Sequence, residues 1–131
     1  MSDPTAPYHA HVYYAADSRA TAAALRQRLD RLRVRDTRGQ PLFVGELRDR
    51  PVGPHPQAQF EVHFTRAFLP AVLPLLEASG LTTLVHPLTD DDLADHTRLA
   101  HWLGSPIPLD LTVLDPPGIN QGLARFGRSD V

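Results

Sequence analysis

The sequence predicts an α+β fold in which helices cover one face of an antiparallel β-sheet, with an extra helix and strand toward the C-terminus. Apolar and polar residues alternate at residues 8–14 and 59–64, which is the period of a strand. Leucines recur at helical spacing after residue 18 and again at 68–78. The order of strand, helix, strand, strand, helix and strand is that of the split βαβ, or ferredoxin-like, arrangement. We expect a single domain in these 131 residues, with a core at about 8–114 and a C-terminal tail at 115–131.

The first predicted strand, at residues 8–14, carries two histidines on one face. Because side chains alternate across a strand, His9, His11 and Tyr13 point to the same side. Two histidines that face one way can supply two nitrogen ligands to one metal ion. The alternative is that His-x-His is only the polar face of a half-exposed strand.

A helix and two further strands are expected next. Asp17 or Ser18 can cap a helix whose Leu25, Leu29 and Leu32 fall on one side. A turn at 39–41 leads into a strand at 42–47, and a loop at 48–56 is stiffened by its prolines. The strand at 59–64 has Phe60, Val62 and Phe64 on one face and Gln59, Glu61 and His63 on the other.

The second half of the chain predicts a further helix, a strand, and an additional helix and strand. A leucine-rich helix at 68–78 ends at Gly80, a residue suited to a left-handed cap, and Pro74 is expected to kink it or to delay its start. A fourth strand follows at 81–86. Thr89 and Asp92 resemble the start of a third helix, which we expect to run to Leu103. Residues 109–114 can add a peripheral strand before a tail that we expect to be partly disordered.

The split βαβ order makes a specific prediction about which residues meet. The first and third strands are neighbours at the centre of the sheet, and the fourth lies on the other side of the first. Both helices cover one face, so the polar residues gather on the face that is left open. These residues are His9, His11, Glu61, His63 and His86. Since the fourth strand is antiparallel to the first, His86 should lie near His9.

The composition limits the chemistry available at such a face. The chain has no cysteine, and all 13 of its basic residues are arginine, so thiol nucleophiles, sulfur ligands and lysine Schiff bases are excluded. Any metal must be held by His, Asp, Glu or backbone oxygen, a ligand set that suits iron(II), manganese(II) or zinc. A formal net charge of -2 gives no reason to expect nucleic acid or membrane partners. The start of the chain shows no leader pattern, so we expect a cytoplasmic protein.

Two histidines outside the strands are candidates for a functional role. His55 stands between two prolines that fix its backbone, although it can also be a surface histidine in a turn. On the third predicted helix, His96 falls in the middle of the apolar face formed with Leu93 and Leu99. A histidine there is either a structural one that is hydrogen-bonded within the core or one that is aimed at a site. His101 is expected to face solvent.

Four segments together resemble the DOPA 4,5-dioxygenase family, a group of small bacterial and fungal ring-cleavage proteins. The segments are His9-Ala10-His11-Val12-Tyr13, Pro51-Val52-Gly53-Pro54-His55-Pro56, Val85-His86-Pro87 with Asp90, and Asp95-His96 with Trp102-Leu103-Gly104. The resemblance implies a ferredoxin-like fold, often dimeric, and extradiol cleavage of a catechol by O2 at non-heme iron. The family's histidine positions correspond to His9, His11, His55, His86 and His96 in this chain. Glu61 and His63 depart from the family pattern, which puts their role as ligands in doubt.

The leading hypothesis is therefore an extradiol dioxygenase that acts on a catechol such as L-DOPA. It assigns iron(II) binding to His9, His11 and His86, acid-base catalysis to His55 and His96, and substrate orientation to Tyr13 and Arg48. We expect a homodimer whose small-molecule partners are the catechol and O2. Two alternatives stay open. One is a metal-independent ferredoxin-like binding or regulatory protein, and the other is a cofactor-independent oxygenase of the dimeric α/β-barrel kind.

Overall fold

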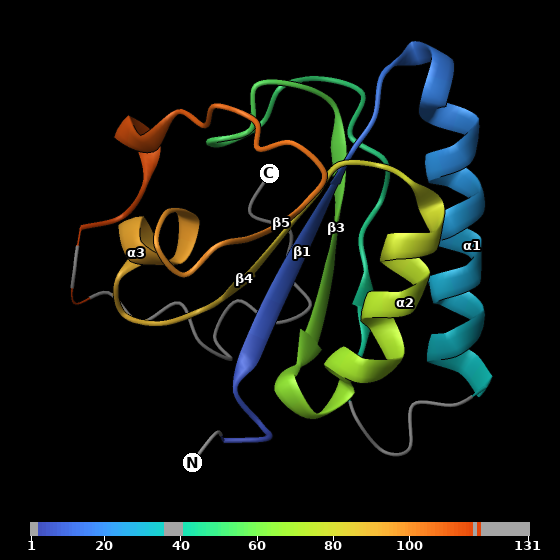
Figure 1. Ribbon diagram of the computed structural model, residues 1–131, viewed down its shortest axis with the longest axis horizontal. Coiled ribbons are helices and arrows are strands. Elements are labelled where there is room, and N and C mark those ends of the chain that lie inside the picture. The colour runs from blue at the N-terminus through green and yellow to red at the C-terminus, as the bar shows by residue number, and fades with distance from the viewer. Residues whose placement is uncertain (1–2, 36–40, 117, 119–131) are drawn as a thin grey trace.

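The computed structural model describes residues 3–35, 41–116 and 118, and its centre is a five-stranded antiparallel sheet (Figure 1). The strands are β1 (Pro7–Tyr13), β2 (Phe43–Val44), β3 (Gln59–Thr65), β4 (Thr83–Pro87) and β5 (His101–Leu103). They lie in the order β2-β3-β1-β4-β5. The order of the first four strands is the ferredoxin-like one, so the predicted fold class is confirmed.

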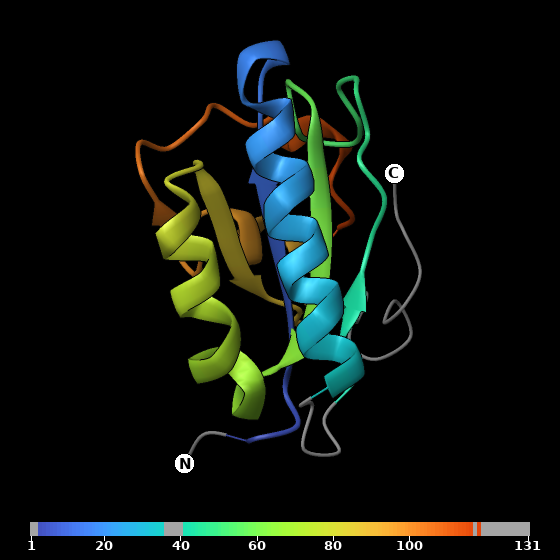
Figure 2. The same cartoon turned by 90° about the vertical axis from the view of Figure 1, so that its right-hand side faces the viewer.

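The two long helices pack side by side against one face of the sheet, as Figure 2 shows. They are α1 (Arg19–Arg35), which follows the short 3-10 turn η1 (Ala16–Ser18), and α2 (Leu69–Ser79), which follows η2 (Arg66–Phe68). The helix α2 ends at Gly80 with φ 72°, the left-handed cap that the sequence predicts. Pro74 lies inside α2 and does not delay its start, contrary to one expectation.

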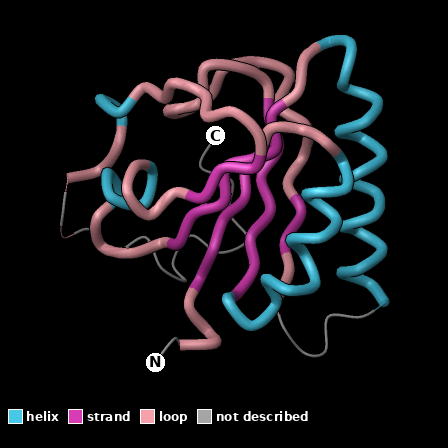
Figure 3. The backbone as a smooth tube through the Cα atoms, viewed as in Figure 1, coloured by secondary structure: helices cyan, strands magenta, loops and turns pink. Residues whose placement is uncertain are grey.

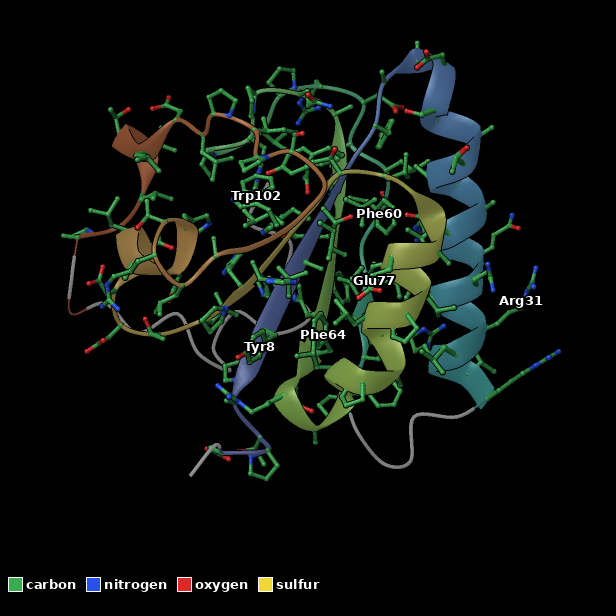
Figure 4. All side chains as sticks on the ribbon, in the orientation of Figure 1. Tyr8, Arg31, Phe60, Phe64, Glu77 and Trp102 are labelled. Carbon is green, nitrogen blue, oxygen red and sulfur yellow. The ribbon has the colours of Figure 1, made fainter. Side chains whose placement is uncertain are left out.

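The hydrophobic core lies between these helices and the sheet. Phe60 and Phe64 point from β3 toward the helices, whereas Arg31 reaches away from α1 (Figure 4). Leu25 and Leu29 of α1 and Val72 and Leu76 of α2 complete this layer from the helical side, as their spacing predicts. One face of each central strand therefore packs into the hydrophobic core.

The register of β1 decides which side chains meet on the opposite face. His9 is the direct partner of His63 on β3 and of His86 on β4, and His11 is the partner of Glu61. Since directly paired residues on neighbouring strands share one face, four imidazoles and a carboxylate come together there. The predicted proximity of His86 to His9 is confirmed.

The third predicted helix is present, but its predicted extent to Leu103 is wrong. The helix α3 covers only Asp92–His96, and the chain then turns and pairs with β4 as the edge strand β5. The Thr97 hydroxyl donates to the Leu93 carbonyl at 2.6 Å, and the Thr97 backbone leaves the helical region. Such a local hydrogen bond competes with helix continuation. Leu93 and Leu99, expected on a buried stripe, are exposed.

Two predicted strands also differ from the structure. Residues 109–114 form no strand but contain the 3-10 turn η3 (Leu111–Val113), because Asp110 accepts hydrogen bonds from the backbone and hydroxyl of Thr112. The strand expected at 42–47 is reduced to β2. Beyond it, pairing with β3 continues only through Gly45 and an isolated bridge between Arg48 and Gln59. The expected tail disorder concerns residues that lie almost entirely outside the described part of the chain.

The histidine-bearing face is not open, which corrects a further expectation. Figure 3 shows that loops and α3 lie across the side of the sheet opposite α1 and α2. His9 is 1% exposed and His11 is 4% exposed. The cluster is therefore an interior one.

Within the described residues, no helix is long and apolar enough to cross a membrane.

Candidate functional site

Three imidazoles from the central strands form a cluster whose nitrogens converge. His9 and His11 come from β1 and His86 from β4, and one ring nitrogen of each lies within 4.8 Å of the others. Nε2 of His11 and Nε2 of His86 lie 3.1 Å apart. The alternation of β1 and the register with β4 are enough to explain this convergence.

In His11 and His86, Nε2 is the inner nitrogen, which faces the cluster, and Nδ1 is the outer one. The hydrogen bond made by the outer nitrogen determines whether the inner nitrogen carries a proton or a lone pair. Nδ1 of His86 lies 2.8 Å from the carbonyl oxygen of Pro87, and Nδ1 of His11 lies 3.1 Å from Oε1 of Gln59. These oxygens only accept hydrogen bonds, so in each neutral ring Nδ1 carries the proton and Nε2 carries a lone pair. Two lone pairs facing each other at 3.1 Å repel unless a proton or a metal ion lies between them.

Burial keeps these rings neutral, which suits ligand function. Burial, followed by the neighbouring imidazoles, lowers the pKa of His11 well below its ordinary value. Burial and then the charge of His96 lower the pKa of His86 to about 3. Neutral imidazole is the form that binds metals. The donor set therefore fits a metal ion such as iron(II), manganese(II) or zinc.

A cavity of about 140 Å³ opens beside this cluster. The covering loops contribute Gly53, Pro54 and His55, α3 contributes Asp92 and His96, and the segment after η3 contributes Leu114 and Asp115. The full lining is His9, His11, Gly53, Pro54, His55, Glu61, His86, Leu88, Asp92, His96, Val113, Leu114 and Asp115. All five histidines singled out by the family resemblance therefore line a single cavity.

A hydrogen bond from Tyr13 orients the ring of His55. Nδ1 of His55 is hydrogen-bonded to the Tyr13 hydroxyl, and the His55 ring lies 4.1 Å from that of His11, centroid to centroid. Burial raises the pKa of Tyr13, so the phenol stays protonated and donates this hydrogen bond. Burial, followed by the charge of His96, lowers the pKa of His55 to about 3. The neutral ring then keeps its proton on Nε2 as a donor.

His96 differs from the other cavity histidines because Asp92 supports its charged form. Nδ1 of His96 lies 2.8 Å from the Asp92 carbonyl oxygen and 3.3 Å from Asp92 Oδ1. Burial acts to lower the pKa of His96, but these hydrogen bonds and the Asp92 charge outweigh it and raise the pKa. Asp92 is itself held by the backbone N–H of Asp115, which donates to Oδ2 at 2.9 Å. His96 is thus the cavity group best suited to exchanging a proton near neutral pH.

The remaining predicted site residues lie outside the cavity lining. Tyr13 is buried beneath His55, and its ring also stacks on Trp102. Arg48 is placed by its backbone pairing with Gln59. His101 is exposed on β5, as expected. Three apolar lining residues were not predicted: Leu88 directly follows β4, whereas Val113 and Leu114 reach the cavity through the return of the chain over the sheet.

The fold and the cavity define a small α+β protein with a buried histidine cluster that could hold a metal ion. A model described as the Dopa 4,5-dioxygenase family matches residues 8–113. The chain therefore belongs to the Dopa 4,5-dioxygenase family, and the resemblance predicted from its four segments is confirmed.

Individual relatives agree with this assignment. The chain is 34% identical to the DOPA 4,5-dioxygenase of Amanita muscaria and 33% identical to an uncharacterized 21.2 kDa protein of Botryotinia fuckeliana, over 82% of this chain in both cases. It spans only 49% and 62% of the lengths of those two proteins. The crystal structure of a "putative dioxygenase" from Nostoc punctiforme is 34% identical, with a TM-score of 0.73 over 86% of this chain and 96% of that one.

Proposed function

We propose that this protein is an extradiol dioxygenase that opens the ring of a catechol with O2, using iron(II) held by His9, His11 and His86. The observation that carries the proposal is the 3.1 Å approach of two imidazole nitrogens in a cavity lined by three further histidines and carboxylates. Two nitrogens about 2.1 Å from one shared ion can be separated by this distance. Family membership supplies the reaction class, and the catechol is an inference from the name of the Amanita muscaria relative.

The bound ion would supply Lewis acidity toward the diol and the redox chemistry that O2 requires. The protein supplies the rest of the site. His96, supported by Asp92, accepts the proton that the catechol hydroxyl loses and later returns it to the product. His55 offers Nε2–H to a developing negative charge on oxygen, because Tyr13 occupies its Nδ1.

The cavity walls position the ring and limit the access of water. Leu88, Val113 and Leu114 form its apolar part, and the backbone of Gly53 and Pro54 brings His55 close to the ligand cluster. An aromatic substrate would pack against the leucines with its oxygens toward the histidines. A homodimer and a cytoplasmic location stay predictions.

The test is oxygen-dependent turnover by the iron-loaded protein. Metal-free protein is loaded anaerobically with iron(II) and mixed with catechol, 4-methylcatechol or L-DOPA, and O2 is then admitted. We expect O2 uptake and a yellow ring-opened product that absorbs in the visible. No uptake with any catechol would refute the function. Turnover that persists in excess chelator would favour the cofactor-independent oxygenase instead, and a protein with neither turnover nor metal affinity would favour the binding protein.

Replacing Tyr13 with phenylalanine tests the hydrogen bond that orients His55. Without the phenol, Nδ1 of His55 is free to take the proton, and the donor at Nε2 is lost in part of the population. We expect kcat to fall about 10-fold, less than the roughly 10²-fold or more attached to an acid-base group itself. Iron content should not change. A matched Tyr14→Phe variant removes a phenol that is bonded to Asp49 on the surface, and it should keep full kcat.

A further inference from the structure

The carboxylate of Glu61 is the charged group on the histidine face that the proposed reaction does not use. Glu61 lies on β3 directly opposite His11 and is 2% exposed. Its Oε2 is 3.9 Å from Nδ1 of His11, and its Oε1 is 3.6 Å from Nε2 of His63. Neither oxygen accepts a hydrogen bond from the residues that the structure describes. A buried carboxylate without hydrogen bonds is costly, and proteins keep one where a cation compensates it.

The position of Glu61 relative to His11 indicates which role it can take. Its oxygen approaches Nδ1, the outer nitrogen, and not Nε2, the nitrogen that faces His86. A carboxylate on the outer nitrogen of a metal-binding imidazole orients the ring and makes the inner nitrogen more basic. Oε1 of Gln59 lies closer to this nitrogen, at 3.1 Å, and accepts its hydrogen bond, so Glu61 acts on His11 through its charge at 3.9 Å.

The other oxygen of Glu61 reaches a second ligand through His63. The ring of His63 stacks on that of His9, with centroids 3.6 Å apart and planes 5° from parallel. Such a stack fixes the plane of His9. The same geometry argues against an ion held jointly by His9, Glu61 and His63, although their ligand atoms are close enough. Two parallel stacked rings cannot both aim their in-plane lone pairs at one ion.

The neighbouring strand leaves space for this arrangement. Gly45 donates its N–H to the Glu61 carbonyl at 2.8 Å. A Cβ atom at position 45 would lie 3.1 Å from that carbonyl oxygen and 3.3 Å from Cγ of Glu61. Any larger residue would press on the Glu61 side chain, so the glycine lets β3 hold the carboxylate where it is.

We propose that Glu61 is a positioning residue of the metal centre: its negative charge, close to Nδ1 of His11 and Nε2 of His63, favours the observed orientation of these rings and stabilises the bound cation. The inference rests on the metal site of the proposed function. It assigns a role to two residues, Glu61 and His63, that the family resemblance left unexplained. It also predicts that removing the charge of Glu61 favours the folded state of the metal-free protein and disfavours metal binding.

The test is Glu61→Gln, measured with Co(II) as the probe. Affinity is obtained by competition with a chelator, and the visible spectrum of bound Co(II) reports the ligand arrangement. We expect the affinity for Co(II) to fall about 10-fold to 100-fold. The melting temperature of the metal-free variant should hold or rise, because a buried charge has been removed. Glu77→Gln on the exposed side of α2 makes the same chemical change and should alter neither quantity.

The outcomes separate this inference from the proposed function. Wild-type protein that binds no Co(II) would refute the metal site, and this inference with it. Wild-type affinity in Glu61→Gln, with an unchanged spectrum, would overturn the inference alone. A lower melting temperature without metal, with unchanged affinity per folded molecule, would show that Glu61 is only structural. If Glu61→Gln fails to fold, Glu61→Asp replaces it. That variant keeps the negative charge but moves it away from His11 and His63. We expect its affinity for Co(II) to be lower than that of wild type, whereas wild-type affinity would overturn the proposal.

Discussion

Replacing His11 with alanine is expected to abolish metal retention and, with it, catechol turnover. His11 contributes the Nε2 that faces His86, so its loss leaves His9 and His86 as a pair whose nitrogens no longer converge with a third. His86→Ala should behave in the same way, because it removes the nitrogen that faces His11 at 3.1 Å. Metal content of protein purified in the presence of iron(II) is the direct measurement.

Thermal stability adds a second measurement to the same prediction. Binding of a metal to the folded state alone stabilises wild-type protein by about 2.7 kcal/mol when free metal is ~100-fold above its Kd. A chelator should therefore lower the melting temperature of wild type and leave that of His11→Ala unchanged. Since His11 is buried, the alanine variant also loses packing, and the chelator response is the quantity to compare. His101→Ala, at an exposed histidine on β5, is the control. Wild-type metal content in both the His11 and His86 variants would refute the ligand assignment.

Replacing His96 with glutamine is expected to reduce turnover by about 10² to 10⁴-fold, the usual contribution of an acid-base group. Metal content should not change, because His96 lies outside the cluster of converging nitrogens. Its ring contacts that of His86 at 4.4 Å, and Asp92 holds its Nδ1. Glutamine can keep a polar contact with Asp92 but cannot exchange a proton near neutral pH.

The measurement separates a catalytic from a structural His96. In the catalytic case the melting temperature stays near that of wild type while kcat falls. In the structural case, lost hydrogen bonds cost about 1 to 3 kcal/mol of folding free energy, and turnover per folded molecule is retained. Asp92→Asn should give a smaller loss of kcat, since the ring stays but its support weakens. A His96→Gln variant with full kcat per folded molecule would remove His96 from the mechanism.

The candidate cluster could be predicted from the sequence because two local periodicities constrain it. Alternation in β1 and β3 places His9, His11 and Glu61 on the face away from Phe60 and Phe64. The split βαβ order then makes β1 central and brings His86 beside His9. Each step depends on backbone geometry that a short segment already determines, and the structure agrees with it.

The length of the third helix could not be predicted in this way, because the apolar spacing at its end fits both a helix and an edge strand. Residues 99–103 read as a continuing helical face, but residues 101–103 instead pair with the free edge of β4. An unpaired strand edge is a strong competitor for such a segment, since it offers backbone hydrogen bonds along its whole length. Thr97, whose hydroxyl bonds to Leu93, ends the helix before the leucines can align.

The sequence by itself determined the alternating strands, their order and the face on which the histidines gather, since these follow from side-chain direction and chain connectivity. The tertiary structure alone decided that this face is interior. The loop bearing His55, α3 bearing His96 and the segment ending at Asp115 fold back over it and line the cavity. Contacts of this kind, such as the bond from the Asp115 backbone to Asp92, join residues far apart in the chain. These contacts form only when the sheet has folded, so they cannot be predicted from a local sequence pattern.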